Sequence, residues 1–348
     1  MAVTSEQHTI GDDVGASATV YLPMPPRWLQ RGRRGALFGY ADELAARRLM
    51  ARLAPKAAAF RPDVVLSVMI PDYFMSAAAA YARGAGLPFV LLCHDDYSDF
   101  VPRAGRELLA RVYRQAQHRF CVSKPMEEAF FARYGVRGTV LPPIPSGPAA
   151  PVRRTEDGDP VVIGFAGSIG FGYVEAMVHL ADVLAANGGR LVIASRSPRR
   201  AFAGVFSHPA VEDVGAVTPG EVKRAFLKAG VNVLSVIQSF DAAEISAFRL
   251  NFPSKLTEYS TFGLPLLVVA PENSSASIWV RQNAGSALAV HGLIPGEFVK
   301  AVQRLKSAQE RLRLAEQFHA AAAAFDPELL QRRFEDALVD ACEAGRGL

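Results

Sequence analysis

Short apolar segments alternate with amphipathic segments along most of the chain, and this alternation restricts how the chain can fold. Strands are predicted at residues 63–69, 88–93, 119–122, 161–166, 191–195, 231–237 and 264–270. Helical patterns at residues 73–83, 107–116 and 173–187 separate several of them. Strands that alternate with helices form parallel sheets with helices on both faces, so an α/β fold is predicted.

The chain has 348 residues, which is long enough for two domains. Prolines gather within residues 141–160 together with glycine and charged residues, and we place a linker at residues 146–160. The first domain is predicted at residues 1–145, the second at 161–325 and a terminal helix at 326–348. We further expect no regular structure at 1–17, a loop at 238–250 and helical structure at 295–324.

The formal net charge of +4 is small, and most basic residues are dispersed along the chain. Nucleic-acid-binding proteins usually gather lysine and arginine on one face, so no nucleic-acid partner is predicted. Near the start, Arg27, Arg31, Arg33 and Arg34 lie beside Trp28. We expect this basic group to form a face for peripheral contact with an anionic membrane. The alternative is a solvated basic loop.

The three cysteines, Cys93, Cys121 and Cys342, have neither paired nor metal-binding spacing. This pattern is typical of a reducing compartment and predicts a cytoplasmic protein. No apolar run reaches the ~18 residues of a membrane span, and residues 1–10 are too polar for a signal peptide. No cluster of carboxylates indicates a metal site, so neither a metal nor a cofactor is predicted.

The stretch of residues 251–265 carries the strongest chemical signal. It predicts a helix of about three turns that begins near Pro253, is capped by Asn251 or Ser254, and ends at Gly263. The ammonium of Lys255 and the free N–H groups of the first turn favour an anion such as phosphate. Glu258 follows on the same face of the helix, where its carboxylate can accept hydrogen bonds from ribose hydroxyls. The alternative is a capped helix with a Lys255–Glu258 ion pair.

Phe-Pro-Ser-Lys-Leu-Thr-Glu-Tyr at residues 252–259, followed by Phe-Gly-Leu-Pro, resembles the nucleotide-sugar motif of retaining GT-B glycosyltransferases of the group 1 family. That motif usually has two glutamates separated by seven residues. Glu258 matches the second, whereas Leu250 occupies the position of the first. In members with the Ser-Lys-Leu variant that lack the first glutamate, the lysine serves the diphosphate.

The resemblance implies a GT-B fold of two Rossmann-like domains whose parallel sheets face each other across a cleft. The first domain would bind the acceptor, a glycan or lipid-linked glycan, and the second a nucleotide-diphospho-sugar donor. The expected activity is metal-independent, hexosyltransferase-like transfer of the sugar with retention, in which the nucleotide-sugar is a co-substrate. GT-B proteins also return their terminal helix to the first domain, and we expect the same of residues 326–348.

A glycine-rich turn at residues 167–172 follows the first strand of the second domain, where backbone can approach a phosphate. The resembled family commonly has arginine and lysine here, and this chain has Ser168 and Tyr173. The expected nucleotide-sugar contacts are therefore Gly167, Ser168, Gly170, Arg196, Ser254, Lys255, Leu256 and Glu258. Lys255 is also a predicted catalytic residue.

His94 is the second predicted catalytic residue, because it directly follows the strand at 88–93. Ligands of parallel sheets bind at the carboxyl ends of strands, so His94 is a candidate for contact with the donor sugar or the acceptor. The alternative is a loop histidine whose acidic neighbours, Asp95 and Asp96, cap the following helix.

Two other functions remain open at this point. Arg196, Arg199 and Arg200 follow the second strand of the glycine-rich unit, where arginines can hold the 2′-phosphate of NADP in an oxidoreductase. A GT-B-like nucleotide-binding protein without catalysis is the other alternative. It is suggested by residues 1–22, which offer no clear match to the first strand and glycine-rich loop of the family. We expect either that this segment is cut short or that the acceptor side is built differently.

Overall fold

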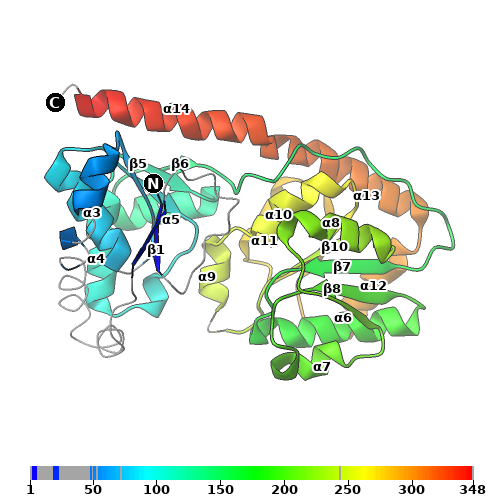
Figure 1. The fold of residues 1–348 in the computed structure, drawn as a ribbon. Coiled ribbons are helices and arrows are strands. Elements are labelled where there is room, and N and C mark those ends of the chain that lie inside the picture. The colour runs from blue at the N-terminus through cyan, green and yellow to red at the C-terminus, as the bar shows by residue number, and fades with distance from the viewer. Residues whose placement is uncertain are drawn as a thin grey trace. The chain divides into compact units, whose positions relative to one another are not determined.

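The structure is a computed structural model that describes residues 2–5, 19–22, 48, 50, 51, 54–70, 73–242 and 244–346. The chain forms two compact units (Figure 1). The first unit comprises Met1–Leu141 and Arg333–Leu348, and the second comprises Pro142–Arg332. The predicted basic group around Trp28 lies outside the described residues, so its contact with membranes stays a prediction.

The first unit contains a parallel sheet of four strands in the order β3-β4-β5-β6. The strands are β3 (Val65–Val68), β4 (Phe89–Cys93), β5 (His118–Cys121) and β6 (Thr139–Val140), and the helices include α3 (Tyr73–Ala85), α4 (Arg103–Gln115) and α5 (Lys124–Tyr134). Helix α5 was not among the predicted elements. A separate parallel pair joins β1 (Ala2–Ser5) to β2 (Thr19–Leu22). The expectation of no regular structure at 1–17 is therefore wrong for residues 2–5.

Helix α14 (Pro327–Arg346) contributes its residues from Arg333 onward to the first unit. The centroid of the Phe334 ring lies 5.4 Å from that of Phe120 on β5. The guanidinium of Arg333 donates to the carbonyl of Val140 on β6 at 3.4 Å. These contacts attach α14 to β5 and β6 of the first sheet.

The second unit contains a parallel sheet of six strands in the order β12-β11-β10-β7-β8-β9. These are β7 (Val162–Ala166), β8 (Arg190–Ala194), β9 (Val211–Gly215), β10 (Val233–Ile237), β11 (Leu266–Val269) and β12 (Ala287–Val290). Strands β7, β8 and β9 follow one another from the centre of the sheet to one edge. Strand β10 then pairs with the free side of β7, and β11 and β12 extend the sheet to the opposite edge. This is the strand order of doubly wound nucleotide-binding folds, with its reversal between β7 and β10.

Helices cover both faces of this sheet because successive strand residues point to opposite sides. On β7, Ile163 and Phe165 join one core, whereas Val162 joins the other. The first core includes side chains of α6 (Val174–Ala186) and α12 (Pro295–Leu305). The second includes side chains of α8 (Pro219–Lys228) and α11 (Ser275–Gln282). Figure 1 shows these helices along the two sides of the sheet.

One predicted segment differs from the structure, because the loop expected at 238–250 contains a helix, α9 (Ile245–Leu250). The helical structure expected at 295–324 is confirmed, and it is divided into α12 and α13 (Ala308–Ala321). The division occurs at Ser307, whose side chain accepts a hydrogen bond from the Glu310 amide and caps α13. Apolar spacing did not reveal this break because both helices pack on the same sheet.

Residues 142–160, which we call the crossing segment, belong to the second unit. The linker predicted at 146–160 is thus packed on that unit. The amide of Arg153 donates to the carbonyl of Gly263 at 2.8 Å. Arg311 on α13 is only 1% exposed, and its guanidinium donates to Thr155 Oγ1 and to the carbonyls of Glu156 and Leu305, each at 2.7 Å.

Replacing Arg311 should therefore loosen the crossing segment. Arg311→Met removes hydrogen bonds from a charged donor and deprives the buried carbonyl of Leu305 of this donor, which should lower the free energy of unfolding by about 3 kcal/mol. Urea denaturation of the full chain measures this change. Arg313→Met on the same helix is the matched control, because its ion pair with Glu310 is partly exposed and should contribute less than ~1 kcal/mol. Equal effects of the two substitutions would contradict the anchoring role of Arg311.

Candidate functional site

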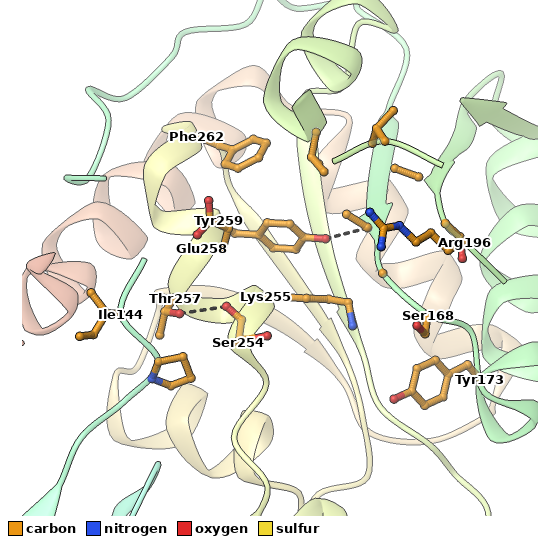
Figure 2. A pocket seen from close by; sticks show the side chains of 17 residues that line it. Ile144, Ser168, Tyr173, Arg196, Ser254, Lys255, Thr257, Glu258, Tyr259 and Phe262 are labelled. Carbon is orange, nitrogen blue, oxygen red and sulfur yellow. Dashed lines mark hydrogen bonds between the residues drawn. The ribbon is translucent and has the colours of Figure 1, made fainter. Parts of the chain in front are cut away.

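A cavity of about 630 Å³ lies at the carboxyl ends of β7 and β8 in the second unit (Figure 2). It is lined by Ala166, Gly167 and Ser168 after β7, by Ala194, Ser195 and Arg196 after β8, and by side chains of α10 (Ser254–Glu258). The cavity adjoins the reversal of strand order at β7, where doubly wound proteins bind ligands. Its volume is in the range of ~300–1,000 Å³ found for small-molecule sites.

Helix α10 differs in detail from its prediction. It has five residues and continues as a 3-10 turn, Tyr259–Phe262, until Gly263 ends it at φ +68°. Pro253 occupies the N-cap position, and no side chain caps the helix, so the capping roles predicted for Asn251 and Ser254 are wrong. Because α10 is little more than one turn long, its dipole contributes less to an anion site than a three-turn helix would.

Lys255 extends from α10 into the cavity, toward Ser168 and Tyr173 (Figure 2). Its ammonium lies 5.1 Å from the centroid of the Phe165 ring and, within the described part of the chain, has no hydrogen-bond acceptor or carboxylate partner. Burial lowers the pKa of Lys255 from its ordinary value of 10.5 to about 8. A partly desolvated ammonium without a counter-charge is a strong site for an anion.

Gly167 makes room for this ammonium. A Cβ atom at residue 167 would lie 2.4 Å from Cε of Lys255, and the residue has φ +126°, a conformation that favours glycine. The Gly167 amide already donates to the carbonyl of Ala194 at 2.9 Å, and the Ile169 amide donates to Ser197 Oγ at 2.8 Å. These two N–H groups of the glycine-rich turn are thus occupied, which moves the expected phosphate contact toward Lys255.

Glu258 also lines the cavity, but it does not pair with Lys255. Its carboxylate accepts hydrogen bonds from the amide of Ser146, at 2.9 Å, and from the Ser146 hydroxyl. Figure 2 shows the Lys255 and Glu258 side chains leaving α10 in different directions. The alternative of a simple Lys255–Glu258 ion pair is therefore wrong, and the two charges serve different parts of the cavity.

Other predicted contacts are distributed unevenly. Ser168, Arg196 and Ser254 line the cavity, whereas Gly170 does not. Leu256 is fully buried in the second core, so its side chain anchors α10 and does not contact a ligand, contrary to the prediction.

Tyr173 is a cavity residue that the sequence analysis noted only as a departure from the resembled family. Burial, with a smaller contribution from the nearby carboxylate of Glu244, raises the pKa of Tyr173 to about 12. Its phenol therefore stays neutral and can donate a hydrogen bond to a bound ligand. In the sequence, the only sign that Tyr173 lines a cavity is its position after a glycine-rich turn. A tyrosine at such a position does not by itself indicate a binding site.

The arginines required by the NADP alternative do not form one group. Arg196 lines the cavity, but Arg199 makes a two-pronged ion pair with Asp213, with both nitrogen–oxygen distances at 2.7 Å. Arg199 also donates to the carbonyls of Ser195 and Ser197. A guanidinium with these partners is already satisfied, which weakens the case for a 2′-phosphate site.

His94 lies in the first unit, directly after β4, with an exposed side chain. Partial desolvation lowers the pKa of its imidazole, and Asp95 opposes this effect. Asp96 accepts hydrogen bonds from the amide of Ser98 at 3.0 Å and from Arg133 at 2.9 Å, which fixes the loop that carries His94. The catalytic role of His94 stays a prediction.

Comparisons with known proteins agree with this architecture. Residues 10–147 match the model of Glycosyltransferase Family 4. No curated protein sequence matches the chain. The structure is similar to sucrose-phosphate synthase from Thermosynechococcus elongatus, with a TM-score of 0.65, 14% identity and coverage of 94% of this chain and 84% of that chain.

Two further structures are similar. One is an α,α-trehalose-phosphate synthase (UDP-forming) from Burkholderia vietnamiensis, with a TM-score of 0.62, 15% identity and coverage of 94% of this chain and 88% of that chain. The other is the lipopolysaccharide outer core galactosyltransferase WaaB in its apo form, with a TM-score of 0.59, 16% identity and coverage of 93% and 84%. The fold is GT-B. Together with the family match, the GT-B fold supports a glycosyltransferase.

Within the described ranges, no helix is both long enough and apolar enough to cross a membrane. No three histidine, cysteine, aspartate or glutamate side chains there are grouped so as to hold a metal ion. The expectations of no metal and no cofactor stay predictions.

The lowered pKa of Lys255 leads to a pH-dependent prediction. Between pH 8 and 10.5 the unfolded chain binds more protons than the folded chain at this residue, so the contribution of Lys255 to stability should increase as pH rises through that window. NMR of ¹³C-labelled lysine should give a Lys255 titration midpoint near 8, with Lys255→Met to assign the signal. A midpoint at the ordinary lysine value of ~10.4 would disprove the desolvated environment.

Proposed function

We propose that this protein transfers a sugar from a nucleotide-diphospho-sugar to an acceptor with retention of configuration. The observation that carries the proposal is the unpartnered ammonium of Lys255, which faces a cavity at the strand-order reversal of a GT-B fold. We propose a diphosphate as the anion at this site, because the attraction between a phosphate group and a cation is strongest where water does not screen the two charges.

The cavity offers a distinct environment for each part of such a donor. Lys255 and Arg196 supply positive charge for the diphosphate. The Glu258 carboxylate can accept hydrogen bonds from the ribose hydroxyls. Apolar side chains on the lining, among them Val217, Val222 and Phe262, can pack against a flat base.

The chemistry requires the enzyme to stabilise negative charge that grows on the β-phosphate as the sugar leaves. A fixed cation in a partly desolvated site does this without reorganising at the moment of reaction. We propose that Lys255 has this role and that the reaction needs no metal ion. The neighbouring hydroxyls of Ser168 and Tyr173 can orient the phosphate or sugar oxygens.

The similar proteins guide the choice of donor and acceptor. The trehalose-phosphate synthase is named as UDP-forming and WaaB as a galactosyltransferase. UDP-sugars are therefore the first donors to test. For the acceptor we propose a glycan or lipid-linked glycan, with peripheral membrane contact by the basic residues near Trp28.

One observation favours a second candidate, a nucleotide-binding protein without catalysis. Leu250 stands where the resembled family usually has its first glutamate, and it is buried at 5% exposure at the end of α9. An apolar side chain there contributes no charge to the reaction. Turnover distinguishes this candidate from the enzyme.

A ligand panel tests the proposal. UDP-, GDP- and ADP-sugars and NADP are compared by thermal shift in EDTA, followed by assays for release of the nucleoside diphosphate. At least one sugar nucleotide should raise Tm, because a ligand that binds only the folded state stabilises it, and its turnover should persist in EDTA. Stabilisation by NADP alone would instead favour the oxidoreductase. Binding of sugar nucleotides without turnover on any glycan acceptor would favour the second candidate.

Lys255 and Glu258 should affect different kinetic constants. Lys255→Ala should lower turnover about 10²–10³-fold at saturating donor, because its charge acts most strongly in the transition state. Glu258→Gln should weaken donor affinity and leave saturated turnover less affected, because ribose does not change charge during transfer. Steady-state kinetics measure both effects.

Lys228→Ala is the control for this pair, since Lys228 is an exposed lysine at the end of α8, away from the cavity. It should retain the kinetics of the unmodified protein. Near-normal turnover of Lys255→Ala with saturating donor would remove Lys255 from the catalytic role.

A further inference from the structure

Ser146 holds the carboxylate of Glu258 with two hydrogen bonds. The Ser146 amide donates to one carboxylate oxygen at 2.9 Å, and the hydroxyl donates to the other oxygen. The two residues are 112 positions apart in the sequence, and both belong to the second unit. One residue thus fixes both oxygens of a carboxylate on the cavity wall.

The contact comes from outside the cavity. Glu258 lines the cavity, and so do Pro143 and Ile144 of the crossing segment, but Ser146 does not. A carboxylate has about four acceptor positions on its two oxygens. Ser146 uses two of them, which leaves acceptor capacity on the Glu258 carboxylate for a ligand in the cavity.

This arrangement also restricts the motion of Glu258. A free glutamate side chain loses rotamer entropy when it is fixed. Because Ser146 fixes the carboxylate before any ligand arrives, part of that cost does not fall on ligand binding. Ser146 itself is exposed, whereas the flanking residue Pro145 is buried in the second unit and anchors this part of the crossing segment.

We propose that Ser146 is a positioning residue that holds Glu258 for recognition of the donor ribose, an inference that rests on the proposed function. Ser146 then sets how strongly the site prefers a ribose with its 2′-hydroxyl over a deoxyribose. A carboxylate fixed at hydrogen-bonding distance loses its partner when the hydroxyl is absent, whereas a mobile carboxylate can turn to water.

The test compares affinities for UDP, GDP and ADP with those for their 2′-deoxy forms by isothermal titration calorimetry. For the nucleotide that binds best, Ser146→Ala should weaken binding of the ribo form roughly tenfold and change binding of the deoxy form little. Ser146→Thr retains both donors and should restore the preference. In a Glu258→Gln background, Ser146→Ala should have no additional effect on the ratio.

Gly147→Ala is the matched control, because a Cβ there meets no atom within 4 Å, and it should keep the ratio of the unmodified protein. A purely structural role of Ser146 would weaken ribo and deoxy forms equally and would overturn the inference. Tighter ribonucleotide binding by Ser146→Ala would also overturn it, because Ser146 would then compete with the ribose. If the unmodified protein binds none of the three diphosphates, the proposed function fails together with this inference.

Discussion

The chemistry proposed for the second unit depends on the desolvated ammonium group of Lys255. A charge removed from water without a counter-charge raises the free energy of the folded state, and the lowered pKa of Lys255 reflects that cost. The face of the Phe165 ring, 5.1 Å away, offsets part of it through its negative potential. Groups with strongly shifted pKa values cluster at functional sites, and this is the basis for proposing Lys255 as a functional residue.

The fold keeps this ammonium in place by linking the two walls of the cavity. Leu256 and Tyr259 bury α10 in the core, and the Tyr259 hydroxyl accepts a hydrogen bond from the Ala166 amide at 2.9 Å (Figure 2). The end of β7 and the helix that carries Lys255 are thereby joined directly. Gly263 allows the chain to leave the helix where a Cβ would lie 2.0 Å from the carbonyl of Pro151. The crossing segment thus packs tightly against the same element.

The crossing segment contributes both to the packing of the second unit and to the candidate site. Near its end, Arg311 anchors Thr155 and Glu156 to α13, and near its start Ser146 fixes Glu258. Positive and negative charge on α10 are consequently kept apart, with Lys255 directed toward the glycine-rich turn and Glu258 toward the crossing segment. Separate charges suit a ligand whose anionic and hydroxyl-bearing parts are adjacent but distinct, as in a nucleoside diphosphate.

The sequence by itself determined the parallel sheets, because the alternation of apolar strands and amphipathic helices permits few other arrangements. It also indicated that Lys255 and Glu258 belong to a candidate site and that Gly263 ends the helix, since these residues lie within one short stretch whose spacing has local meaning. Only the tertiary structure decided that Glu258 pairs with Ser146, that Arg199 is occupied by Asp213 and that Tyr173 faces the cavity. The physical reason is that the partner of a side chain is set by packing between segments that are far apart in the chain. The local pattern of a single sequence does not indicate which distant segments come into contact.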